Sequence, residues 1–71
     1  MSAKDLIRHH IRHGSAPVRA DDSIPKGQFS LRDKQTERVV AAGKMTDKAT
    51  PPTAGRVLCV NPEDYSDLGG V

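Results

Sequence analysis

Hydrophobic and polar positions alternate with a helical period most clearly in residues 2–14. At about 100° per residue, one face of a helix holds Ala3, Leu6, Ile7, His10 and Ile11. Ser2 and Asp5 form a variant of the capping box, in which both side chains can accept a backbone N–H of the first turn. Gly14 is the residue type that commonly follows a helix in the left-handed conformation. The pattern therefore predicts a helix from about residue 3 to about residue 13.

Residues 15–29 keep neither a helical nor a strand period, and they contain two prolines, a glycine and two adjacent acids. Residues that precede a proline are biased towards extended backbone. We predict an extended linker whose apolar anchors are Val18, Ile24 and Phe29. Such spaced anchors suit a segment laid across a partner, and equally a loop that is fixed to the core of its own chain.

Residues 30–43 begin and end like a helix. Ser30 and Asp33 repeat the N-terminal capping pattern, and Gly43 stands where a helix would end. A strand over 36–42 is the competing interpretation, because Thr and two adjacent Val residues favour a pleated surface. The helix is the prediction, and the choice between helix and strand for 36–42 stays open.

The last part of the chain predicts a loop, a strand and a short helix. Residues 44–55 are polar and Pro-rich, and the apolar run 56–60 is bounded by Gly55 and by Asn61-Pro62. Asn61 as N-cap and Pro62 at the first helical position announce a helix within 56–71, with Tyr65 and Leu68 as its apolar side. If 36–42 is extended, it is expected to pair with 56–60 as an antiparallel ribbon.

Composition indicates that these elements bury little. The chain has 71 residues, of which 35% are hydrophobic and 3% aromatic, with no Trp. A single core of this size gives limited stability, and the aromatic side chains that usually supply much of the buried area are scarce. We therefore expect one small domain, mainly α with extended segments, that has little core of its own.

Charge is modest, at a formal net value of +2. Lys4, Arg8 and Arg12 form a basic stripe along the predicted first helix, and Arg19 follows it. These four side chains are the candidates for contacts with phosphate groups. No aromatic residue lies among them to stack on bases, so a solvated helix face is the simpler interpretation.

Candidate chemistry is sparse. The single Cys59 excludes an internal disulfide and suits a reducing compartment, and its apolar surroundings suggest a buried, inert thiol. His9 and His13 have the spacing of two metal ligands on a helix, but no obvious third ligand lies nearby in sequence. We expect no catalytic site, no bound metal and no cofactor. We also expect neither a signal peptide nor a membrane span, and a location in the cytoplasm or in a virion.

These features favour an accessory structural subunit that docks on a larger protein assembly and is ordered by several neighbouring chains. A bacteriophage virion, in its capsid or tail, is an assembly of this kind. The alternative is a small nucleic-acid-binding or regulatory protein that uses the basic face of the first helix. The side chains expected to dock on the assembly are Leu6, Ile7, His10, Ile11, Val18, Ile24, Phe29, Tyr65 and Leu68.

Overall fold

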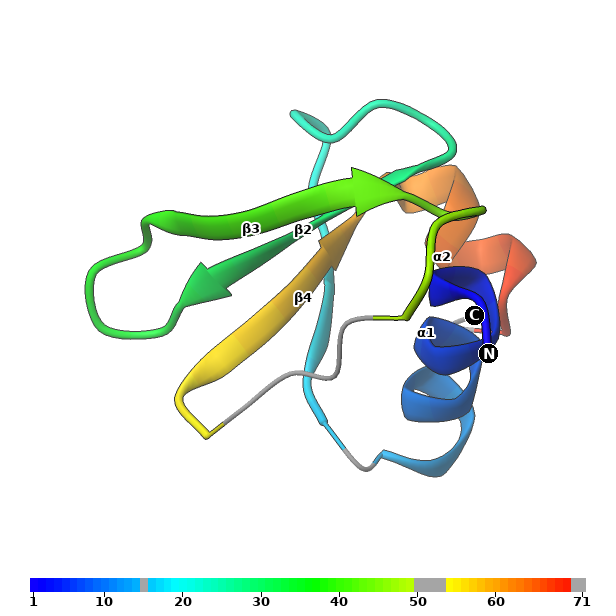
Figure 1. Cartoon of the computed structure of the whole chain (residues 1–71), viewed down its shortest axis with the longest axis horizontal. Coiled ribbons are helices and arrows are strands. Elements are labelled where there is room, and N and C mark those ends of the chain that lie inside the picture. The colour runs from blue at the N-terminus through cyan, green and yellow to red at the C-terminus, as the bar shows by residue number, and fades with distance from the viewer. Residues whose placement is uncertain (15, 50–53, 70–71) are drawn as a thin grey trace.

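The computed structural model describes residues 1–14, 16–49 and 54–69, and it shows a four-stranded sheet packed against two helices (Figure 1). The strands lie in the order β1-β4-β2-β3. β1 runs parallel to β4, whereas β2 pairs antiparallel with both β4 and β3. The elements, in chain order, are α1 (Ala3–His13), β1 (Val18–Ala20), β2 (Gln28–Asp33), β3 (Val39–Lys44), β4 (Arg56–Val60) and α2 (Pro62–Asp67).

The expectation of a mainly α chain with little core is wrong. More residues lie in strands than in helices, and the chain forms a compact globule. β4 supplies the centre of the core, since its apolar run is buried from Val57 to Val60. A central strand that is covered on both faces is expected to be apolar without interruption. The small number of aromatic residues is offset by these aliphatic side chains.

The two faces of β4 belong to different clusters. Leu58 and Val60 join the main core with residues of both helical regions, of β2 and of the loop after β3. Val57 and Cys59 point to the opposite face, where they contact Ile24. The main core consists of Ala3, Ile7, Phe29, Leu31, Met45, Leu58, Val60 and Leu68. We call the side of the sheet opposite α1 the open face, because no helix of the described residues packs on it.

α1 confirms the predicted helix at residues 3–13. The Ser2 hydroxyl accepts the Asp5 N–H, and Gly14, at φ 65°, donates its N–H to the His10 carbonyl. Two backbone hydrogen bonds from the first turn, Ala3 N to Asp47 O and Lys4 N to Met45 O, fasten the helix to the loop that follows β3. α1 is therefore part of the fold through its backbone as well as through its apolar face.

The predicted helix over 30–43 is wrong, because this stretch is a β-hairpin made of β2 and β3. Asp33 does not cap a helix. Its carboxylate accepts the backbone N–H groups of Gln35 and Thr36 and thereby shapes the hairpin turn. Gly43 does not end a helix either, since it lies opposite Phe29 in the sheet. A Cβ at Gly43 would come to 3.0 Å from the Phe29 ring, so a larger residue there would have to displace the aromatic side chain.

The remaining predictions are partly confirmed. β4 and α2 coincide with the predicted strand 56–60 and the predicted C-terminal helix, which Asn61 caps by accepting the Glu63 N–H. The linker 15–29 is not simply extended, because it contains β1, which pairs with β4. The ribbon expected between 36–42 and 56–60 does not form, since β2 lies between β3 and β4. Residues 50–53 of the predicted Pro-rich loop lie outside the described residues.

Candidate functional site

The structure places the predicted docking side chains mainly inside the protein. Ile7, Ile24, Phe29 and Leu68 are buried, with exposed fractions of 5% or less. The other five are half-buried, and three of them, Ile11, Val18 and Tyr65, pack against the main core; the remaining two are Leu6 and His10. The apolar face of α1 is thus covered by the protein's own sheet, so it is not a free surface for a partner.

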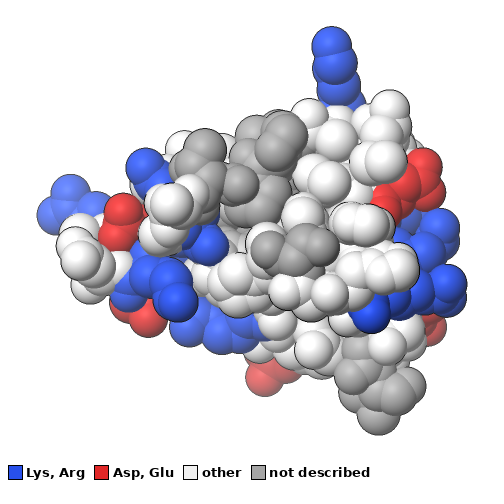
Figure 2. Space-filling view, turned by 90° about the horizontal axis from the view of Figure 1, so that it is seen from below, with Lys and Arg blue, Asp and Glu red and all other residues white. Residues whose placement is uncertain are grey.

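The four predicted phosphate contacts do not form one patch. Lys4, Arg8 and Arg12 lie on α1, but Arg19 projects from β1 on the open face, where its side chain contacts Glu37 and Cys59. Among the described residues drawn in Figure 2, Lys and Arg side chains gather at the left and the right of the view with mostly uncharged residues between them, and one more projects at the top. Arg8 is also paired with Asp5, at 3.3 Å. A continuous basic track for a nucleic acid is therefore not present on the face drawn in Figure 2.

The histidines of α1 do not gather further ligands. The rings of His9 and His13 lie side by side, with centroids 4.5 Å apart. Over residues 1–14, 16–49 and 54–69, no group of three or more His, Cys, Asp or Glu side chains is arranged to hold a metal ion. Burial, and next the nearby charge of His9, lower the pKa of His10. His10 is therefore a neutral imidazole at neutral pH.

Cys59 is fully buried, with 0% of its surface exposed. It lies on the open face beneath Arg19, whose Nη2 atom is 3.8 Å from the sulfur atom. Catalysis by a thiol would require a histidine from the first helix, but α1 packs on the other side of the sheet. The structure thus does not bring the thiol and the histidines together.

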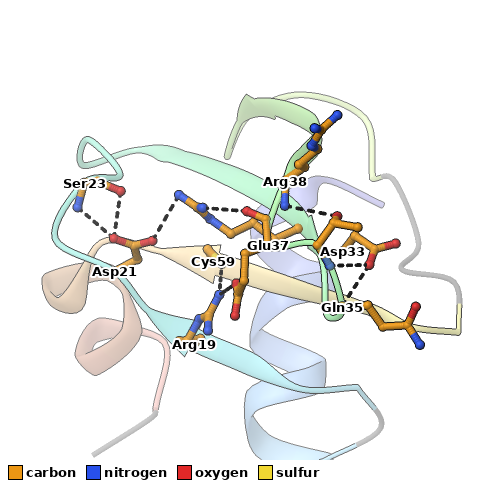
Figure 3. Close-up of polar contacts among 10 residues, drawn as sticks. Arg19, Asp21, Ser23, Asp33, Gln35, Glu37, Arg38 and Cys59 are labelled. Atoms are coloured by element: carbon orange, nitrogen blue, oxygen red, sulfur yellow. Dashed lines mark hydrogen bonds and ion pairs between the residues drawn. The ribbon is translucent and has the colours of Figure 1, made fainter.

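A polar network covers the open face and joins β1, β2 and the hairpin turn (Figure 3). Arg19 donates to the Glu37 carboxylate at 3.0 Å, and Arg32 donates to the Glu37 carbonyl at 3.0 Å. Arg32 also forms an ion pair with Asp21 at 3.5 Å. Glu37 adopts φ 60°, a left-handed conformation that costs a non-glycine residue about 1 kcal/mol. The two arginines hold the turn in this strained conformation.

The carboxyl groups of this face have lowered pKa values because they are hydrogen-bonded. The side-chain hydrogen bond from Arg19 lowers the pKa of Glu37. The hydroxyl and backbone N–H of Ser23 lower the pKa of Asp21, and the backbone N–H groups of Thr36 and Gln35 lower the pKa of Asp33. With their acids ionised, Arg19 and Arg32 are each paired with an acid, so neither offers a free cation to an anionic ligand.

These shifts predict a loss of stability in acid. Groups with a lowered pKa stabilise the folded state above their ordinary pKa of about 4, and this contribution is lost as the pH falls through the lower folded value. We expect the melting temperature to fall from about pH 5 downwards, and the fall to be shallower in Asp33→Asn, whose amide oxygen can still accept the turn N–H groups. Thermal melts of both proteins at several pH values measure this. Protonation of His10 also lowers the stability, but this loss begins at a higher pH, about 6.5, and it is the same in wild type and in Asp33→Asn. Equal slopes in the two proteins below pH 5 would contradict the role of Asp33.

The outer edge of β3 is the feature that sequence reasoning missed. β3 is the last strand of the sheet, and no other described segment pairs with its outer side. Val39 and Val40 are 51% and 47% exposed, the largest exposed apolar side chains of the described residues apart from Met1. The register between β2 and β3 shifts at this point, because Leu31 pairs with Ala41 whereas the next residue, Arg32, pairs with Val39. In the sequence, the adjacent β-branched residues Val39 and Val40 favoured a strand, but the capping pattern at Ser30 was given more weight and predicted a helix.

Positive charges flank this edge. Arg38 precedes β3 and Lys44 ends it, and both are exposed. Neither side chain takes part in an ion pair with any residue of the described ranges. In Figure 3, Arg38 points away from the polar network of the open face. The edge is therefore an apolar stretch with an unneutralised cation at each end.

Scans of the chain against protein-family models, curated proteins and solved structures find no match. Among the helices that the structure describes, none is long and apolar enough to span a lipid bilayer. The physical properties of the open edge and its surroundings are accordingly the basis for a functional assignment.

Proposed function

We propose that the chain is a non-enzymatic accessory subunit that joins a larger protein assembly through the outer edge of β3. The observation that carries this proposal is the exposure of Val39 and Val40 on an unpaired edge strand. An edge strand presents unused backbone N–H and C=O groups, and extended segments of other proteins bind by adding a strand to such an edge. Small proteins usually protect or shorten these edges, so an exposed apolar one indicates a partner.

The compact fold changes the reason for the proposal. Because the chain has its own core, docking does not depend on partners that order it. Docking on the apolar face of α1 would require Ile7, which is only 1% exposed, to leave that core. A bacteriophage virion, in its capsid or tail, is one assembly of the proposed kind. The buried Cys59 suits a reducing compartment such as the cytoplasm in which such an assembly forms.

Site-specific photo-crosslinking tests the proposed edge. A photoreactive amino acid replaces Ala42, which is exposed on β3, or His9, which is exposed on α1, in the organism that encodes the chain. We expect a discrete covalent adduct from position 42 and none from position 9. Adducts only from position 9, or none from position 42, would refute docking at β3.

The substitution Val40→Lys is expected to release the protein from its assembly without unfolding it. Val40 is about half exposed, so the change in the free energy of unfolding should stay within about 0.5 kcal/mol. A lysine at position 40 would place a charge in the middle of the edge, where an added strand would have to cover it with apolar side chains. Gel filtration of native extracts measures the result, with wild type at high mass and the variant at monomer size. Val40→Thr is the control, because it keeps the branched side chain without a charge.

A further inference from the structure

We infer that the segment which β3 receives is an extended acidic one, with apolar side chains at its centre and an Asp or Glu near each end. This inference rests on the proposed docking at β3 and adds the chemistry of the partner. It follows from the charges that flank the edge, from the direction of its backbone groups and from the poor fit of a second copy.

The charges come first. Arg38 and Lys44 lie at the two ends of β3, six positions apart, and both are exposed and outside any ion pair of the described residues. The nearby acids are otherwise engaged. Glu37 binds Arg19, and the Asp47 carboxylate accepts the backbone N–H of Lys44 at 2.8 Å. Carboxylates of an added strand would therefore meet cations that form no ion pair with the neighbouring described acids.

The backbone of β3 is suited to strand addition near its centre. Because the Lys44 N–H is bonded to Asp47 instead of β2, it points to the outer side. Backbone groups alternate along an antiparallel strand, so the N–H and C=O of Ala42 also point outwards. Ala41, Ala42 and Gly43 are small residues, and Val39 and Val40 precede them on the same strand. An added strand would bond to Ala42 and cover the valines with its own apolar side chains.

A second copy of the chain fits this edge poorly. If two β3 strands paired antiparallel about Ala41, Arg38 of each copy would face Lys44 of the other, at both ends of the interface. Like charges directly opposite one another on neighbouring strands are destabilising. A parallel pair would place each cation beside its own counterpart. In these two registers the two cations disfavour self-association, whereas an acidic segment would meet them with opposite charges.

Two synthetic peptides with blocked ends test the inference. One has the sequence Glu-Val-Thr-Val-Thr-Val-Glu, and the other has Lys in place of both Glu residues. Titration of the isotopically labelled full-length chain, followed by backbone amide NMR, should show binding of the acidic peptide about tenfold tighter at low salt. The largest shifts are expected at Ala42 and its neighbours, and the difference between the peptides should shrink as salt is added.

Charge reversal provides the matched control. Arg38→Glu is expected to weaken binding of the acidic peptide about three- to tenfold and to strengthen binding of the basic one. Arg12→Glu changes the net charge equally, but it lies at the far end of α1 and should alter either affinity less than about twofold.

Each other outcome overturns the inference in a recognisable way. Equal binding of both peptides at β3 would refute the acidic preference while leaving docking at this edge intact. No shift at β3 with either peptide would refute addition of a free extended segment, whereas the crosslinking at Ala42 decides the proposed function separately. A concentration-dependent dimer that Val40→Lys dissociates would identify the occupant as a second copy.

Discussion

Replacing Ile7 by aspartate is expected to unfold the protein. Ile7 is 1% exposed and packs in the main core between α1 and the sheet. Truncating such a side chain costs about 2–5 kcal/mol, and burying a carboxylate without a partner adds several more. Domains of this size have stabilities near the lower end of about 5–15 kcal/mol. Circular dichroism with a thermal melt should therefore show a cooperative transition for wild type and none for the variant.

His9→Asp is the control for this experiment, because His9 lies in the same helix but is exposed. It should melt within a few degrees of wild type. A folded Ile7→Asp variant with an unchanged transition would mean that α1 does not contribute to the core. Because Ile7→Asp is expected to unfold, its absence from the assembly would not show which surface docks. The Val40→Lys variant, which is expected to stay folded, tests docking at β3.

The thiol of Cys59 is expected to be protected from labelling by at least about 10³-fold relative to the unfolded chain. It has no exposed surface, and Arg19 and Glu37 lie over it. Labelling then requires an opening of the fold, and about 1.4 kcal/mol of opening free energy gives each factor of ten. The rate of reaction with a chromogenic disulfide, measured in buffer and in concentrated urea, provides the ratio.

Substitutions at the polar network separate local from global opening. Glu37→Gln removes the charge that holds the turn to Arg19 and should accelerate labelling severalfold if the turn opens locally. Lys34→Gln, in the same turn but outside the network, should leave the labelling rate unchanged. A native thiol that reacts as fast as the unfolded one would contradict the burial of Cys59.

Local signals predicted the elements whose ends are set by their own residues. The caps at Ser2, Gly14 and Asn61 gave α1 and α2, and the bounded apolar run gave β4. The same signals misled at Ser30 and Asp33, because an aspartate that accepts N–H groups can shape a hairpin turn as well as a helix start. The pairing that decides between these outcomes involves β4, which lies over twenty residues further on.

The candidate site depended on information that the sequence does not carry locally. That β3 is an edge follows from the strand order, which places β4 between β1 and β2. The separation of Arg19 from the cations of α1 follows from the two faces of the sheet. The association of Arg19 with Glu37 joins residues 18 positions apart. Charge and exposure could be assigned to individual side chains only after these long-range relations were known.

The position of β4 also determines when the fold can form during synthesis. It is a central strand, bonded to β1 on one side and to β2 on the other, yet it is the last of these four strands to leave the ribosome. Until residues 56–60 emerge, β1 has no partner and the β2–β3 hairpin has no apolar strand beside it. Closing the β1–β4 pair spans about forty residues, which makes folding slower than in a chain of local contacts. The nascent chain therefore exposes its strand edges until β4 has emerged, and a ribosome stalled before Arg56 holds a chain that cannot complete this sheet.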